Sequence, residues 1–447
     1  MYPKLKALRD SLDARYGPAP TSPPTKPRAD SVFIESYQVQ GLPPATEELL
    51  LLLLRPRHYY TAPLLSAAIR DAFGTRAFRK ITYSLQPASD SSARLVFDVE
   101  PAAATRVGLG LNYNSLTSIG LIGSLTVQDK LAPASTSQIA FNIGENPRLH
   151  LKHVQYLGPQ QRLVGRLLAQ GERVSITTYS TSFRKAGLYT QNYVLANAQL
   201  LRLLDRNRAV GLGTRYEYGR FTPEITSRLQ LDGRISLLNS DLFYEENTLN
   251  AVAYPTHGRK VEVEYGWVYQ QRPSFKLLSD TTIIGTEQST AFSFQPYEHS
   301  RLNVEQYLLL NKRATLQVQV QAGVNRRYRQ AIANDFVVGG LNGVLRNQLT
   351  FAGLPETGIY TGSAVAGLVG YQYAVSPKVF LTAKANALYY DFIANEARPQ
   401  SARLAYGGAL SLGLNSFLGP IDVSLMYSNV AKKLLPYFNV GFPFGYR

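Results

Sequence analysis

The chain has 447 residues, more than a single domain usually holds, and 47 Lys and Arg residues against 31 Asp and Glu residues give it a formal net charge of +16. No apolar run approaches the roughly 18–20 residues that a spanning helix needs, which excludes a helical membrane protein. The basic residues form neither a basic helix nor a stripe interleaved with aromatic side chains, so we do not expect nucleic acid as a partner.

The first 31 residues predict two short segments. Residues 1–16 carry Leu5, Leu8 and Leu12 at helical spacing, which predicts an amphipathic helix with too little apolar surface to stand alone. We interpret this helix as the remnant of an upstream domain. Residues 17–31 contain five prolines and predict a stiff, extended linker.

Residues 32–101 predict one small α/β domain in the order strand, helix, helix, strand, strand. Thr46 opens the first helix, which continues through the leucine run that follows it. The second helix begins at Thr61, has a proline in its first turn and ends at Gly74. Apolar alternation over residues 83–99 predicts the two closing strands.

From residue 105 to residue 447 the pattern changes to alternation with a period of two. In one strand Leu316 and Val318 face one way, while Gln317 and Gln319 face the other. The same division recurs at residues 107–114, 210–219, 261–270 and 421–428. Because whole strand faces carry Glu, Gln, Arg and Gly, we expect lipid outside and a polar lumen inside. The sequence predicts an all-β transmembrane antiparallel barrel of about sixteen strands.

The lengths of the predicted connections support this fold class. Tight connections are expected at residues 205–207, 311–313, 376–377 and 418–420, and long ones at residues 171–188, 271–297 and 327–356. Short periplasmic turns and long surface loops are typical of outer-membrane barrels.

Three motifs carry a resemblance to a known family. Pro255 to Gly258 look like a Pro-x-x-Gly turn ahead of a long strand, and Gly339, Gly340 and Arg346 look like a Gly-Gly segment with a degenerate Val-Arg-Gly-Tyr loop tip. The third motif is an alternating aromatic end that resembles a terminal strand signal: Phe438, Val440, Phe442 and Phe444. With these motifs, residues 105–447 resemble the BamA-type superfamily of outer-membrane assembly and transport barrels, and residues 32–101 resemble a POTRA domain.

Within that superfamily the tail looks most like the barrels of bacterial patatin-like phospholipases. Gly419 and Pro420, followed by Lys432 and Lys433, carry this likeness. It implies a lipase domain, one POTRA domain and a sixteen-stranded barrel in that order, with residues 1–16 where the lipase would end. No secretory signal opens the sequence at Met1, although an outer-membrane protein needs one. Either the expected localisation is wrong, or the chain is a fragment of a native chain that extends upstream with a signal and a further domain.

No catalytic, cofactor-binding or metal-binding motif is evident in the sequence. The chain has no Gly-x-Ser-x-Gly nucleophile elbow, and we interpret Asp232 with Gly233 as a turn and not as the Asp-Gly of a hydrolase dyad. His150 and His153 would face opposite sides of a strand and could not share a metal ion. We therefore expect no enzyme activity and no cofactor in this chain.

Arg346 is the residue for which we expect a functional role. The resemblance implies that its loop folds into the lumen, where the guanidinium could pair with an acidic wall residue and plug the pore. Asp391 is a candidate partner, although strict alternation from Lys384 would point it outward, so the pairing requires a bulge or loop position. The alternative is that both residues are solvated loop charges.

The leading interpretation is an outer-membrane barrel and POTRA module, the latter periplasmic, that anchors and could also translocate a patatin-type hydrolase. The alternative is an assembly or secretion factor whose POTRA domain captures client polypeptides by adding a strand to its sheet edge. A passive diffusion pore would need neither a POTRA domain nor a long loop that enters the lumen. Expected partners are outer-membrane lipid, the barrel assembly machinery during insertion, and unfolded polypeptide or the upstream hydrolase. A homodimer is a further possibility.

Overall fold

A computed structural model describes most of the chain, in two compact units, 1–102 and 103–447. The described residues are 32–42, 47, 50, 51, 54, 58–74, 78–88, 92–101, 103–115, 118–158, 161–180, 183–225, 229–279, 282–289, 294–329, 334–393 and 402–442. The helix and linker expected at residues 1–31, most of the helix expected after Thr46, and Phe444 lie outside them. The one helix whose bounds are defined is too short to cross a bilayer.

The first unit is a four-stranded sheet with one helix. Its elements are β1 (Val32–Gln40), β2 (Tyr59–Tyr60), α3 (Ala62–Gly74), β3 (Phe78–Pro87) and β4 (Ser92–Pro101). The sheet order is β2-β1-β4-β3, with β1 and β4 parallel and the other two pairs antiparallel. The helix lies where the sequence predicts it, one residue after Thr61 and closed by Gly74.

A single apolar core holds this unit together. Ile34, Leu50, Leu95 and Phe97 are almost completely buried in it. Gly41 follows β1 with φ of +88°, and a Cβ atom there would lie 2.3 Å from the carbonyl oxygen of Val99, so this position requires glycine.

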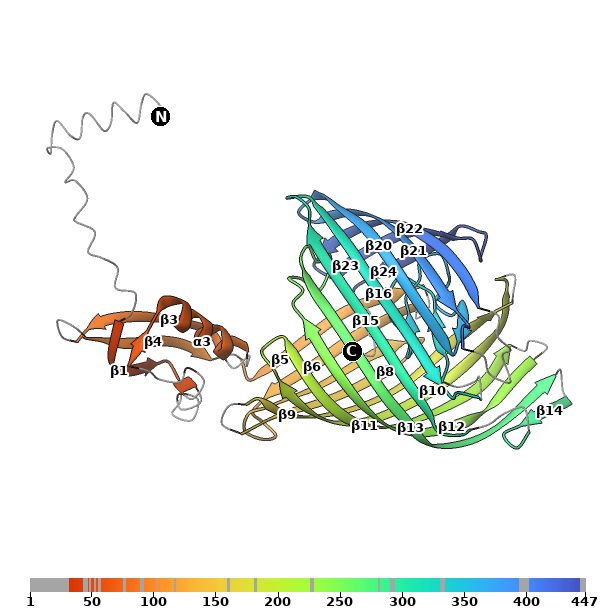
Figure 1. The fold of residues 1–447 in the computed structure, drawn as a ribbon, viewed down its shortest axis with the longest axis horizontal. Helices are drawn as coiled ribbons and strands as arrows, with labels where there is room; N and C mark the ends of the chain where they lie inside the picture. The colour runs from red at the N-terminus through yellow and green to blue at the C-terminus, as the bar shows by residue number, and fades with distance from the viewer. Residues whose placement is uncertain are drawn as a thin grey trace, which may run out of the picture. The chain divides into compact units, whose positions relative to one another are not determined.

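The second unit is a closed antiparallel barrel (Figure 1). Its first nine strands are β5 (Thr105–Asn114), β6 (Ser118–Gln128), β7 (Ser135–Gly144), β8 (Arg148–Leu157), β9 (Leu163–Tyr179), β10 (Lys185–Leu203), β11 (Arg208–Ile225), β12 (Leu229–Asn247) and β13 (Gly258–Ser279). The other seven are β15 (Tyr297–Leu309), β16 (Ala314–Arg326), β20 (Ser363–Ser376), β21 (Val379–Tyr390), β22 (Arg403–Ser416), β23 (Gly419–Ser428) and β24 (Leu435–Val440). These sixteen strands confirm the predicted fold class.

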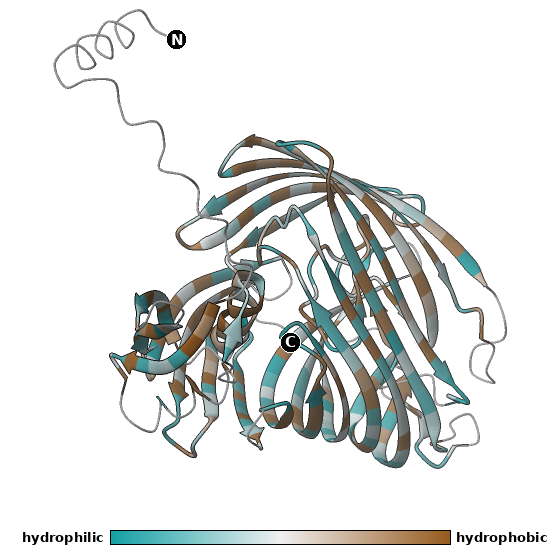
Figure 2. Ribbon diagram, turned by 60° about the vertical axis from the view of Figure 1, so that its left-hand side comes forward, coloured by the Kyte–Doolittle hydropathy of each residue, from teal (hydrophilic) through white to brown (hydrophobic). Residues whose placement is uncertain are grey.

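The barrel places polar residues inside and apolar residues outside, as the alternation predicts. On β16, Gln317, Gln319 and Gln321 are each 8% exposed, whereas Val320 is 40% exposed. Figure 2 shows the resulting alternation of polar and apolar positions along many strands. The apolar side chains on the outer surface are suited to contact membrane lipid.

The hairpins of the barrel differ from the sequence expectation in two places. The segment expected as a loop at residues 171–188 is mostly paired, because β9 continues to Tyr179 and β10 begins at Lys185. Likewise β13 continues to Ser279 and pairs with a short strand, β14 (Thr282–Thr286). Long hairpin strands that project beyond their neighbours carry the same polar residues as loops, so composition did not distinguish them.

The turn expected at Asp232 and Gly233 is also wrong. Both residues lie within β12 and pair with Lys276 and Phe275 on β13. A Cβ atom on Gly233 would lie 2.3 Å from the Cβ of Phe275, so this glycine serves close cross-strand packing.

Strand parity assigns each connection to one end of the barrel. We call the end at which β5 begins the entry end, and the opposite end the far end. Tight turns close β10 to β11, β15 to β16, β20 to β21 and β22 to β23 at the entry end, near the predicted positions. The entry end also holds a longer connection, residues 248–257, while residues 327–362 form the longest connection at the far end.

Candidate functional site in the barrel lumen

The far-end connection at residues 327–362, here called the lumen loop, folds inward and forms a small sheet. Its strands are β17 (Phe336–Val338), β18 (Gln348–Leu349) and β19 (Ile359–Thr361), in the order β18-β17-β19. Phe336, Val338 and Phe351 are fully buried there. The loop is therefore a packed element with its own apolar core.

Gly339 and Gly340 permit the sharp turn after β17. Their φ angles are +146° and +70°, which other residues rarely adopt. A Cβ atom on Gly339 would lie 1.8 Å from the carbonyl oxygen of Pro355. The Gly-Gly segment that the sequence singled out is thus required by backbone conformation and by close backbone approach.

Gln348 fixes the tip of the loop. Its side-chain oxygen accepts hydrogen bonds from the backbone N–H groups of Val344 and Leu345 at 2.7 and 2.9 Å, and its amide nitrogen donates to the carbonyl oxygens of Gly339 and Asn342. Four bonds from one buried side chain close residues 339–348 into a rigid turn. Arg346 lies within this turn.

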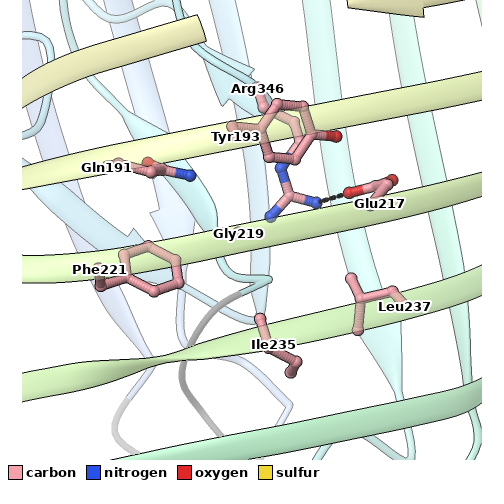
Figure 3. Close-up of a pocket in the computed structure, with 8 residues that line it drawn as sticks. All are labelled: Gln191, Tyr193, Glu217, Gly219, Phe221, Ile235, Leu237 and Arg346. Atoms are coloured by element: carbon pink, nitrogen blue, oxygen red, sulfur yellow. Dashed lines mark hydrogen bonds and ion pairs between the residues drawn. The ribbon is translucent and has the colours of Figure 1, made fainter. Parts of the chain in front are cut away.

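Arg346 reaches the barrel wall at β10 and β11 (Figure 3). Its guanidinium forms an ion pair with Glu217 on β11 and donates a hydrogen bond to the side-chain oxygen of Asn334. It also lies 5.2 Å from the ring centre of Tyr193 on β10. Charge, hydrogen bonding and a cation–π contact together hold the planar guanidinium, which a lysine could not match.

Glu217 belongs to a larger charge network on the lumen wall. Arg215 contacts Glu217 at 3.0 Å and Glu264 on β13 at 2.6 Å. Arg346 therefore joins a pre-existing chain of alternating charges. Because Glu217 is 4% exposed, its carboxylate depends on both arginines for compensation.

Asp391 lies elsewhere. It follows β21 with φ of +56°, at a loop position, and accepts a hydrogen bond from the hydroxyl of Thr361 at 2.7 Å. The ion pair formed by Arg346 is with Glu217, so the proposed Arg346–Asp391 pairing is corrected. Sequence alternation does place Glu217 on the polar face of its strand, but it offers no way to choose among the many acidic side chains of the lumen.

The lumen loop is also tied to several other strands. Thr350 donates hydrogen bonds to the side chain of Gln321 on β16, and Thr357 donates to the carbonyl oxygen of Thr177 on β9 at 2.6 Å. On β23, Ser428 donates to the carbonyl oxygen of Gly353 at 2.7 Å. With β10 and β11, these contacts bring the loop to well-separated parts of the wall, so it crosses the lumen.

The C-terminal aromatic motif forms β24 and its continuation. Phe438 and Phe442 are exposed on the outer surface, and Val440 is half-buried. β24 closes the barrel by pairing with β5, and among the described residues this seam has two register pairs, Asn439 with Asn114 and Val440 with Tyr113. Each of the other neighbouring pairs of the sixteen strands has six or more.

Polar side chains supplement the seam. Asn114 donates to the hydroxyl of Tyr437 at 2.6 Å, and Asn112 donates to the carbonyl oxygen of Phe442 at 2.8 Å. Ser115 accepts a hydrogen bond from the backbone N–H of Phe438. Among the residues that the structure describes, the two edge strands thus meet through two register pairs and several side-chain bonds, without a long backbone ladder.

Within the described ranges, no group of three or more His, Asp or Glu side chains could hold a metal ion. The lumen cluster pairs arginines with carboxylates at hydrogen-bond distance, an arrangement suited to fixing a loop in place.

Comparison with known proteins identifies the family. The family model described as the OMP85 superfamily matches residues 191–444, more than half of the chain. The chain belongs to the OMP85 superfamily. It is an Omp85-type outer-membrane barrel, which confirms the family that the sequence motifs indicated. No curated protein sequence matches the chain.

Solved structures of this superfamily share the fold at low sequence identity. BamA from Haemophilus ducreyi, in a crystal structure lacking POTRA domains 1–3, has a TM-score of 0.62 and 11% identity, and the match covers 98% of this chain and 93% of that one. CdiB from Acinetobacter baumannii has a TM-score of 0.56 and 10% identity, covering 92% and 74%. CdiB from Escherichia coli has a TM-score of 0.51 and 10% identity, covering 97% and 95%.

Proposed function

We propose that this Omp85-type barrel moves polypeptide into or across the outer membrane through the seam between β24 and β5. The observation that carries the proposal is the pairing at that seam. Among the described residues it has two register pairs, supplemented by side-chain hydrogen bonds. An open edge strand offers a template on which another polypeptide can add a strand. The lumen loop argues against a passive diffusion pore, because Arg346 and Glu217 hold it across the channel.

The first unit would act as a POTRA domain on the periplasmic side, which makes the entry end of the barrel periplasmic. Its sheet ends in β3, a ten-residue edge strand with mostly exposed side chains. Such an edge can bind an extended client segment by strand addition. Charged side chains on and beside this edge, such as Lys80 with Glu100 on β4, would discourage indiscriminate pairing.

The passenger that we favour is a patatin-type hydrolase encoded upstream on the same chain, as the tail resemblance implies. The alternative is a separate client polypeptide, as for an assembly or secretion factor. Extending the reading frame upstream of Met1 distinguishes the two. A signal peptide followed by Gly-x-Ser-x-Gly supports the first, and a signal peptide that leads directly to Pro3 excludes it.

A disulfide across the seam tests the transport role. The chain has no cysteine, so Tyr113→Cys with Val440→Cys introduces a single directly opposed pair. The control pair, Leu111→Cys with Leu121→Cys, joins β5 to β6 within a continuous ladder. Purified protein in phosphatidylethanolamine vesicles is given a urea-denatured eight-stranded outer-membrane barrel, and folding of that barrel is followed by its gel shift on heating.

We expect the parent to accelerate folding severalfold, the oxidised seam pair to abolish the acceleration, and reduction to restore it. The oxidised control pair should behave as the parent. Acceleration by the parent that survives seam oxidation would refute transport through the seam. If the parent does not accelerate folding, the handling of separate client polypeptides is refuted. The remaining test is then in cells that carry the seam pair: surface exposure of the upstream domain is compared with and without oxidation.

A further inference from the structure

Residues 248–257 connect β12 to β13 at the entry end. They contact strands that lie far from β12 and β13 around the barrel. The hydroxyl of Tyr254 donates a hydrogen bond to the carboxylate of Asp422 on β23 at 2.8 Å. Going around the barrel from β13, the strands β15, β16, β20, β21 and β22 lie between the two. This segment therefore crosses the entry-end opening to the opposite wall.

The opposite wall has a shaped seat for the Tyr254 side chain. The ring stacks on Phe380 of β21, with ring centres 4.4 Å apart and an interplanar angle of 15°. Gly413 of β22 forms the floor, because a Cβ atom there would lie 2.6 Å from the tyrosine ring. Gln372 of β20 donates to the carbonyl oxygen of Pro255 at 3.4 Å. Four adjacent strands thus receive the segment.

The segment is stiffened by its own hydrogen bonds. The side-chain oxygen of Asn250 accepts from the backbone N–H groups of Thr256 and His257 at 2.9 and 3.2 Å, and its nitrogen donates to the Thr256 hydroxyl. Gly258 has φ of +108°, and a Cβ there would lie 2.3 Å from the carbonyl oxygen of Thr248. A preorganised loop loses little conformational freedom when it docks.

Tyr254 itself has φ of +50°, in the left-handed region that non-glycine residues rarely occupy. Such a conformation persists only where surrounding contacts over-determine it, and the seat on β21, β22 and β23 supplies those contacts. β23 also pairs directly with β24, the strand at the seam. The seat therefore lies on the part of the wall that adjoins the seam.

We infer that residues 248–257 form a strap that closes the entry-end mouth of the barrel, with Tyr254 as its releasable latch. The lumen loop anchors to β16 at Gln321, farther from this mouth, so strap and loop are two closures in series. Opening the channel then requires both to move.

Access to a cysteine behind the strap tests this inference without any client. Gln317→Cys places one thiol on the lumen face, at the fourth residue of β16 from the entry end. The folded protein in detergent is reacted with a negatively charged maleimide, and the labelling rate is measured. We expect slow labelling of the Gln317→Cys protein and an increase of about tenfold when Tyr254→Ala is added, because that change removes a hydrogen bond to a carboxylate and a ring stack. Tyr254→Phe should give a smaller increase.

A second variant disturbs the same contact from the opposite wall. Gly413→Ala leaves the strap intact but fills its seat, and should also raise the labelling rate. The matched control is Gly110→Ala on β5, where an added Cβ meets no atom within 4 Å. Folding of every variant is checked by its gel shift on heating.

Fast labelling of the Gln317→Cys protein would overturn the strap. Equal labelling rates with and without Tyr254→Ala or Gly413→Ala, in proteins that fold, would overturn it too. Single-channel conductance gives an independent readout, because two constrictions in series each limit the current. Arg346→Ala with Tyr254→Ala should therefore conduct severalfold more than either single variant. A double variant that conducts no better than Arg346→Ala would also overturn it.

Discussion

The Arg346–Glu217 pair illustrates why the loss of one partner differs from the loss of the other. Glu217→Gln leaves Arg346 and Arg215 close together with one carboxylate fewer. Arg346→Met removes the loop charge, and Glu217 keeps its contact with Arg215. Leaving a buried charge unpaired costs more than removing it, by about 3 kcal/mol.

We therefore expect Glu217→Gln to release the lumen loop more often than Arg346→Met does. Limited chymotrypsin digestion of the folded protein measures this, since a released loop exposes Phe336 and Phe351, which are fully buried in the docked loop. Equal cleavage of the two variants would contradict the higher cost of the unpaired charge, and cleavage no faster than in the unsubstituted protein would show that the ion pair contributes nothing to the position of the loop.

Gly339 offers a second test at the level of single residues. Gly339→Ala places a methyl group against the carbonyl of Pro355 and requires a disfavoured φ, so we expect a loss of about 1–3 kcal/mol in loop stability. Gly343→Ala, in the same loop, meets no atom within 4 Å. The midpoint temperature for chymotrypsin cleavage at the buried Phe336 and Phe351 should fall for the first variant and stay unchanged for the second. A fall in both would mean that any side chain in this turn disturbs it.

At the scale of a strand, neighbouring positions on β16 face different solvents. Val320→Lys puts an ammonium group on the lipid face, which costs about 2–4 kcal/mol near the bilayer midplane. Gln319→Lys points into the lumen, beside Asn303, which is itself bonded to Glu262 and Glu305. Folding into vesicles from urea, followed by the gel shift, should drop for Val320→Lys alone. Similar losses in both variants would contradict the assigned faces.

Strand faces were predictable because a two-residue period reports directly on which side of a wall each residue lies. Strand ends were not, since the projecting parts of β9, β10 and β13 keep their hydrogen bonds while carrying loop-like residues. The lumen loop was located from Gly339 and Gly340, whose conformations demand glycine. Its partner Glu217 lies 129 residues from Arg346 in sequence, and only the closed ring brings them together. The strap was not predicted because Tyr254 and its partner Asp422 are also far apart in the sequence and meet only in the closed ring.

For the whole barrel, closure is uneven around the ring. β12 and β13 share a ladder along their whole length, whereas the described contact of β24 with β5 has two register pairs. The lumen loop bonds to β9, β11, β16 and β23, and the strap to β20 and β23. Leu341 of the lumen loop also packs against the apolar cluster that contains Tyr437 of β24. The internal elements thus brace the β23 and β24 side of the seam, and β5 pairs along its length with β6.

This arrangement predicts where the barrel opens first. Backbone amides exchange with solvent by local opening, and the opening free energy falls with the number of hydrogen bonds and packed contacts that must break. In detergent micelles, amides of β24 and of the far half of β5 should exchange several times faster than those in the middle of β12 and β13. Oxidation of the Tyr113→Cys, Val440→Cys pair should slow exchange at the seam and leave β12 unchanged. Uniform protection around the ring would show that the side-chain bonds of Asn114 and Asn112 close the seam as firmly as a full ladder, and transport through it would then need a trigger from outside the chain.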